Sequence, residues 1–173
     1  MKKLLIKIGL VFLLILFFFG ERAKADSEEY VLSNEVLIYS FMTSSGKVLV
    51  LAKDKDDTYI VYRFGTESEI EFQYPEKTKA SWKQFTYSGY MRGGGPANEG
   101  LELNYVYFVN DNYKYVIYDN YYAVTGEITT GVKIINLKTK EQSEIKGEPN
   151  SRIGSLVELR DNNLVPQGEE MFE

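Results

Sequence analysis

The sequence contains no histidine and no cysteine among its 173 residues. A chain without these residues cannot form a Ser-His-Asp triad, a Cys-His pair or a thiolate nucleophile. It also lacks the nitrogen and sulfur ligands that zinc, copper and haem prefer. Because the most common general bases are missing, we expect a binding protein and not an enzyme, and we expect no cofactor.

Chemistry that relies on carboxylates and other oxygen ligands remains open. Glu99 and Glu102 are two acids close in sequence, and two carboxylates about 5–9 Å apart could act on a glycoside. Sequence spacing between strands does not place two carboxyls at that separation, so we favour the interpretation that these are solvated acids at a turn and a strand edge. The oxygen-rich turns 54–57 and 110–112 could bind calcium, but they lack EF-hand spacing and their residue types are typical of hairpin turns. We therefore predict no metal site.

Long apolar runs are absent except in the first 25 residues, which resemble a secretory signal peptide. Lys2 and Lys3 precede an apolar run over 8–19, and Ala23 and Ala25 form a small-x-small cleavage site. An uncleaved membrane anchor is disfavoured because the run is shorter than the ~20 residues of a spanning helix. We expect an exported protein, periplasmic or secreted, that is cleaved after Ala25 and then has no membrane anchor.

The mature chain is expected to be a single domain over 26–173, with a loose start at 26–34 and a frayed tail at 166–173. Without cysteine an exported domain has no disulfides, so its hydrophobic core must stabilise it. A mature chain of 148 residues, after 25 of the 173 are removed, is long enough for such a core.

The sequence also lacks a surplus of basic residues. The leader contains five basic residues and one acidic residue, so its removal changes the net charge from −5 to −9. A nucleic-acid partner is disfavoured, because few basic residues are left over to neutralise phosphates. A cationic protein partner would be attracted to this chain, although the same charge also serves plain solubility.

Helical periodicity is missing from the mature chain, whereas strand patterns separated by turn residues recur throughout it. In 70–74, for example, Ile70, Phe72 and Tyr74 alternate with polar residues. These patterns predict an all-β fold, an antiparallel meander of about 8–10 short strands in an up-and-down barrel or a sandwich. The expected strands are 36–39, 47–52, 59–64, 70–74, 82–90, 101–109, 113–118, 127–136, 143–145 and 155–159.

The stretch 82–109 combines a cation, three consecutive glycines and dense aromatic residues. Arg92 precedes Gly93, Gly94 and Gly95, and Pro96 closes the loop. Consecutive glycines with positive φ can direct backbone N–H groups to one point, where Arg92 would complete an anion-binding concavity. The alternative is a permissive loop that joins two long strands, with Arg92 paired to an acid.

Tyrosine is abundant, with 14 residues, and several tyrosines recur on one strand face. Tyr105 and Tyr107 share a face, as do Tyr113 and Tyr115 on the next strand. Such residues can form a structural cross-strand ladder or an exposed aromatic platform that binds a protein or glycan. The residues predicted to bind a partner are Tyr90, Arg92, Gly93, Gly94, Gly95, Tyr105 and Tyr107.

Export, acidity and a small β domain are typical of an inhibitor or immunity-type protein of the bacterial envelope. The expected partner is a cationic protein such as a lysozyme. Over three residues only, Ser88-Gly89-Tyr90 is similar to a Ser-Gly-containing loop of the periplasmic lysozyme inhibitors. The alternative is a β-barrel that binds a small ligand or a glycan in an aromatic-lined site.

Overall fold

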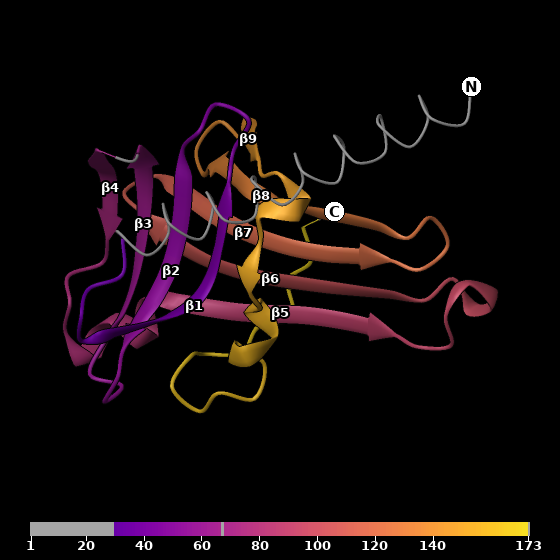
Figure 1. The fold of residues 1–173 in the computed structure, drawn as a ribbon, viewed down its shortest axis with the longest axis horizontal. Helices are drawn as coiled ribbons and strands as arrows, with labels where there is room; N and C mark the ends of the chain where they lie inside the picture. Colours follow the sequence, from indigo (N-terminus) through magenta and orange to yellow (C-terminus); the bar gives the residue numbers. More distant parts are fainter. Residues whose placement is uncertain (1–29, 67, 173) are drawn as a thin grey trace, which may run out of the picture.

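The computed structural model describes residues 30–66 and 68–172. They form two antiparallel five-stranded sheets, which confirms the predicted all-β fold. Figure 1 shows the two sheets packed face to face with their strands crossing, as in an orthogonal sandwich. The predicted leader, with Ala23 and Ala25 at its cleavage site, lies outside the described residues.

The first sheet has the strand order β10-β1-β2-β3-β4, and the second is a continuous meander from β5 to β9. The first sheet contains β1 (Glu35–Met42), β2 (Val48–Asp54), β3 (Ile60–Thr66), β4 (Glu69–Tyr74) and β10 (Ile153–Gly154). The second contains β5 (Phe85–Arg92), β6 (Leu101–Asn110), β7 (Tyr113–Tyr122), β8 (Glu127–Asn136) and β9 (Gln142–Lys146). The described residues also form four 3-10 helices, three between strands and the last after β10: η1 (Lys79–Gln84), η2 (Pro96–Asn98), η3 (Pro149–Ser151) and η4 (Leu156–Leu159).

Two expected strand segments are wrong. Residues 156–159 form η4 with Ser155 as its N-cap, and not a strand, because Leu156 and Leu159 bury their side chains on one side of a 3-10 turn. Residues 82–84 belong to η1, and Trp82 is buried there with its indole N–H donated to the carbonyl of Asp57. The predicted turn at 110–112 is confirmed: β6 and β7 pair from end to end around it, and Asp111 has a φ of 54°.

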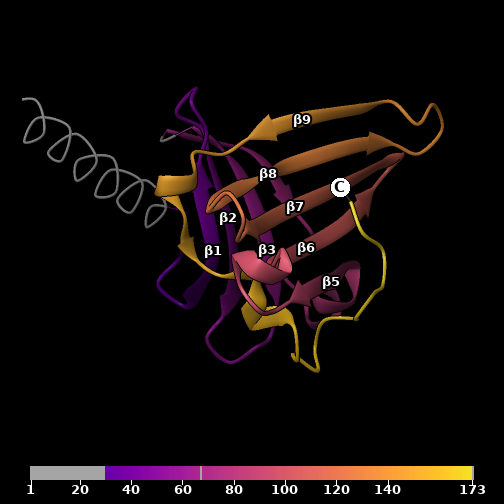
Figure 2. The same cartoon turned by 90° about the vertical axis from the view of Figure 1, so that its right-hand side faces the viewer.

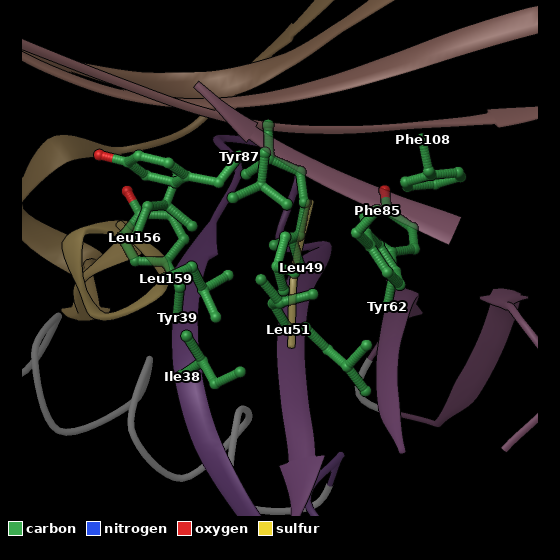
Figure 3. Close-up of a cluster of buried hydrophobic side chains, with 14 of the residues drawn as sticks. Ile38, Tyr39, Leu49, Leu51, Tyr62, Phe85, Tyr87, Phe108, Leu156 and Leu159 are labelled. Carbon is green, nitrogen blue, oxygen red and sulfur yellow. The ribbon is translucent and has the colours of Figure 1, made fainter. Parts of the chain in front are cut away.

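The hydrophobic core lies between the sheets and accounts for much of the aromatic content. The rings of Tyr74 and Tyr115 each stack with the ring of Phe108, with centroid distances of 4.5 and 5.0 Å. Figure 3 shows Tyr62, Phe85 and Phe108 grouped at one end of the core, with aliphatic side chains beyond them. The interior is therefore filled by ring and aliphatic packing contributed by both sheets.

Residues 26–29 of the predicted loose start lie outside the described residues, and Tyr30, where the described chain begins, is fixed to the first sheet. The Tyr30 side chain is buried, and its hydroxyl donates to the carbonyls of Thr66 and Glu69. The carbonyl of Tyr30 in turn accepts a hydrogen bond of 2.7 Å from Arg63. These bonds hold Tyr30 against β3 and the start of β4.

The C-terminal tail is also packed and not frayed over residues 166–172. It lies beside β5 and continues over the second sheet, as Figure 2 shows. Its backbone pairs with Tyr87, and Phe172 is buried with an exposed fraction of 7%. The prediction failed because the side chains that hold this tail come from β5 to β8, far away in sequence.

Candidate binding surface at the end of the second sheet

The second sheet extends past the first sheet at one end, where its hairpins project (Figure 1). The loop 93–100 joins β5 to β6, and the turn 123–126 joins β7 to β8. The Ala123 N–H donates to the Gly100 carbonyl at 2.8 Å, so these two loops lie side by side. We call residues 90–102 and 121–128 the projecting end.

The face of the second sheet that is turned toward the first, its inner face, changes character in three successive rows of cross-strand neighbours. The row in the core is apolar and comprises Tyr87, Val106, Ile117 and Val132. The next row is polar and comprises Gly89, Asn104, Asp119 and Thr130. The last row belongs to the projecting end and comprises Met91, Glu102, Tyr121 and Ile128.

The chain after β9 crosses this face of the second sheet, and two of its arginines, Arg160 and Arg152, bind polar side chains of the sheet. Arg160 donates from Nη2 to the Glu102 carboxylate at 2.8 Å and to Asn104 Oδ1 at 3.2 Å. Its Nε also donates to the Tyr87 hydroxyl at 3.1 Å. The segment excludes water from the polar groups of the sheet that it covers, and hydrogen bonds from each arginine take the place of the bonds to water that these groups lose.

Asp119 forms the second anchor, an ion pair with Arg152. Burial raises the pKa of the Asp119 carboxyl, and the nearby Glu102 carboxylate adds to this effect, while Arg152 partly offsets it. Burial likewise raises the pKa of the Tyr87 hydroxyl. Because Glu102 and Asp119 are each paired with a guanidinium, their evident role in this geometry is to hold the segment in place.

Exposed apolar side chains gather on the projecting end. Four of the ten large hydrophobic residues exposed in the described part of the chain lie there: Tyr90 (49%), Met91 (61%), Tyr121 (43%) and Val124 (62%). Met91 and Tyr121 flank Glu102 in one row of the inner face, and Tyr90 lies on the outer face. Such a concentration on an exposed protrusion is typical of a protein–protein interface.

The glycine loop is held by its own arginine. Nε and Nη2 of Arg92 donate to the Glu99 carbonyl at 2.9 and 2.7 Å, and Nη2 lies 3.5 Å from the Glu99 carboxylate. Gly94 and Gly95 have φ values of 93° and 63°, which glycine adopts readily, whereas Gly93 has no positive φ. Since Arg92 bonds across the loop, this geometry favours the architectural interpretation over an anion site.

A pocket of about 300 Å³ opens between the two hairpin loops. Its lining residues are Arg92, Glu99, Gly100, Leu101, Tyr122, Val124, Thr125 and Glu127. The pocket combines an apolar floor with one cation and two exposed acids, which suits a partner side chain that is both apolar and positively charged.

The structure separates the residues predicted to bind a partner into two places. Tyr90, Arg92 and the three glycines lie at the projecting end. Tyr105 is fully buried and Tyr107 partly buried on the outer face of the second sheet, where Phe172 packs against both rings. Tyr105 lies opposite Tyr118 in the strand register. Tyr113 and Tyr115 lie on the other face of the sheet, so they form no cross-strand ladder with Tyr105 and Tyr107.

The residues predicted to bind a partner did not include Met91, Tyr121 and Val124, which lie exposed on this surface. The turn signal at Thr125-Gly126 places Val124 at a hairpin tip, and it could have identified that residue. Met91 and Tyr121 become neighbours of Glu102 only through the strand register. Ser88-Gly89-Tyr90, compared above with an inhibitor loop, lies within β5, where Ser88 is buried.

Comparison of the chain with protein-family models, with curated proteins and with solved structures gives no match. Within residues 30–66 and 68–172, no helix is long and apolar enough to cross a membrane. The same described residues contain no cluster of three or more acidic side chains placed to hold a metal ion.

Proposed function

We propose that this chain is an exported, non-enzymatic binding protein whose projecting end docks on a cationic protein partner. The inhibitor or immunity type of the bacterial envelope, with a lysozyme as the partner class, fits this proposal. The acidic charge and the prediction of export rest on the sequence, and the choice of this surface rests on its exposed apolar side chains.

One observation carries the proposal: exposed apolar side chains are concentrated on a protrusion that its own sandwich leaves open to a partner. Interfaces place aromatic and methionine side chains at the centre and polar groups around the rim. Met91, Tyr121 and Val124 supply such a centre. Glu99, whose side chain is 78% exposed, and Glu127 supply a rim of negative charge.

The charge arrangement favours a basic partner. The excess of acids accelerates encounter with a cationic surface, an effect that salt weakens because exposed charges are screened beyond about 10 Å at 0.1 M. The Glu99 carboxylate lies 3.5 Å from Arg92, but its side chain is 78% exposed, so Glu99 and Glu127 are the charges of this surface that a partner's lysine or arginine would meet first. The apolar side chains then provide most of the affinity after contact.

The test measures binding of the full chain to a panel of purified lysozymes, with a basic protein of another class as comparison. We expect retention at low salt that weakens at high salt. The double variant Tyr121→Ala, Val124→Ser should reduce affinity at least tenfold, because truncating an interface hot spot costs about 2 kcal/mol or more.

The matched control uses Val109→Ser with Tyr113→Ala, whose side chains are each 42% exposed at the opposite end of the second sheet. This control should bind like the unchanged chain, and both double variants should keep its melting temperature within a few degrees. The proposal fails if no basic protein is retained at low salt. It also fails if the two double variants lose affinity equally.

A further inference from the structure

The C-terminal tail binds the second sheet as an added strand and then as an extended peptide. β5 is the edge strand of that sheet. The Tyr87 N–H donates to the Pro166 carbonyl at 2.9 Å, and the Gly168 N–H donates to the Tyr87 carbonyl at 2.7 Å. Gln167 is therefore in a parallel bridge with Tyr87, which is how peptide ligands add to an exposed sheet edge.

Beyond this bridge the tail crosses the outer face, where one acidic side chain is clamped. Both carboxylate oxygens of Glu170 accept from Lys114 Nζ, at 2.8 and 2.6 Å. The Ser88 hydroxyl donates to the Glu170 carbonyl at 2.6 Å. A charged contact and a main-chain contact thus fix the same tail residue.

Two residues further on, an aromatic side chain fills a pocket of aromatic rings. The Phe172 ring meets Tyr105 and Tyr107 edge-on, with centroids 5.4 and 5.1 Å apart. Lys114 Nζ lies over Tyr107 and Phe172, at 5.1 and 5.3 Å from the ring centroids. Lys133 donates to the Phe172 carbonyl. The ammonium group of Lys114 is thereby shared between an acid and two rings.

This tail is separable from the core that stabilises the fold. Val165, the residue before it, is buried in the cluster between the sheets. Phe172, in contrast, belongs to a separate cluster on the outer face. Removing residues 166–172 from their contacts would uncover Tyr105 and Tyr107 without opening the core between the sheets.

We propose that the outer face of the second sheet is a recognition groove for an extended peptide segment of a partner protein. The segment has an acid followed two residues later by an aromatic residue, and the tail occupies the groove until such a segment displaces it. The specificity follows from the contacts: edge pairing with Tyr87, a carboxylate on Lys114, and a ring against Tyr105 and Tyr107. This groove is separate from the projecting end and does not depend on its proposed function.

The test uses full-length proteins and a fluorescent peptide that carries the sequence of residues 166–173. Binding is measured by fluorescence anisotropy to the unchanged chain and to Phe172→Ala, in which the tail has lost its ring. We expect Phe172→Ala to bind the peptide at least tenfold more tightly, because a tethered tail competes at an effective concentration of about millimolar. Met171→Ala is the matched control, since that side chain is 41% exposed, and it should behave like the unchanged chain.

Two further reagents make the test specific. Adding Lys114→Ala to Phe172→Ala should remove the gain, and a peptide with alanine in place of its phenylalanine should not bind the released groove. If Phe172→Ala does not fold, Glu170→Ala releases the clamp from a half-exposed side chain and replaces it. Failure of the folded, released variant to bind at millimolar peptide would overturn the proposal. A wild-type dimer that Phe172→Ala dissociates would also overturn it, because the groove would then hold the tail of a second copy.

Discussion

Breaking the ion pair between Glu35 and Arg63 should be among the most destabilising single changes in this protein. Both Arg63 guanidinium nitrogens Nη1 and Nη2 donate to the Glu35 carboxylate, at 2.6 and 2.7 Å. Arg63 is 1% exposed and Glu35 is 5% exposed. Arg63 Nε also donates to Gln73, and the Tyr59 hydroxyl donates to Glu35, so the pair has a complete set of partners.

The perturbation we choose is Arg63→Met, which keeps the bulk of the side chain and removes its charge. The carboxylate of Glu35 would then be buried with only the Tyr59 hydroxyl and the Leu32 N–H as partners. Removing one member of a buried ion pair costs about 3–5 kcal/mol, against about 1 kcal/mol or less for an exposed pair. A loss of about 3 kcal/mol lowers the melting temperature of a chain of this size by roughly 6–12 °C.

The dependence of stability on pH reports the ionisation of the Glu35 carboxyl. Burial alone would raise the pKa of the Glu35 carboxyl, but bonds from Arg63, the Leu32 N–H and Tyr59 outweigh it and hold the pKa below its ordinary value. A lowered carboxyl pKa contributes stability above the ordinary pKa, and this stability is lost as the pH falls through the folded value. Arg63→Met removes the main cause of that lowering, so its destabilisation should be smaller in acid than at neutral pH.

Urea denaturation of the full chain at pH 7 and pH 4 measures both effects, with linear extrapolation to water. The double variant Glu35→Gln, Arg63→Met completes the cycle, and it should be more stable than Arg63→Met alone because no buried charge remains unpaired. If Arg63→Met costs less than about 1 kcal/mol at pH 7, the buried ion pair contributes no more than an exposed surface pair, and the predicted large loss is wrong.

Two further predictions concern the edge and the inner face of the sandwich. Gly154→Ala should lower the free energy of unfolding by about 3 kcal/mol in urea denaturation, because φ is +77° and a Cβ atom would clash with the Ile38 carbonyl oxygen at 2.0 Å. The control Gly46→Ala, with φ +80° and open space around it, should cost only about 1 kcal/mol. Equal losses in the two variants would contradict the clash at residue 154. Asp119→Asn should be less destabilising at pH 7 than at pH 4. Burial raises the pKa of the Asp119 carboxyl despite Arg152, so the wild-type protein loses stability as the pH rises from the ordinary pKa through the raised pKa. A variant that loses more stability at pH 7 than at pH 4 would show that the ion pair outweighs burial.

Local patterns were sufficient to predict the fold class and much of the strand order. Alternation and turn residues act between neighbours in sequence, and a meander of hairpins keeps those neighbours together in space. The same reasoning predicted that Tyr105 and Tyr107 share a face and that glycines of the loop can adopt positive φ, as Gly94 and Gly95 do.

Local patterns failed where a segment is held by partners far along the chain. Residues 155–159 look like a strand by composition, yet two leucines three positions apart turn them into a 3-10 helix over the core. The tail looks frayed because its one aromatic residue, Phe172, is isolated in an acidic sequence. Its partners Tyr105 and Lys114 lie more than 50 residues earlier.

The candidate binding surface divides in the same way. The amino-acid sequence alone establishes the acidic charge of the chain, the absence of histidine and cysteine chemistry, and a glycine loop between two strands. Export stays a prediction from that sequence. The folded structure was needed to show that Arg92 closes its own loop, that Tyr105 and Tyr107 lie under the tail, and that Met91 and Tyr121 flank Glu102. The reason is physical: composition and local backbone preference belong to single residues and their neighbours, whereas exposure depends on which sheet covers which face.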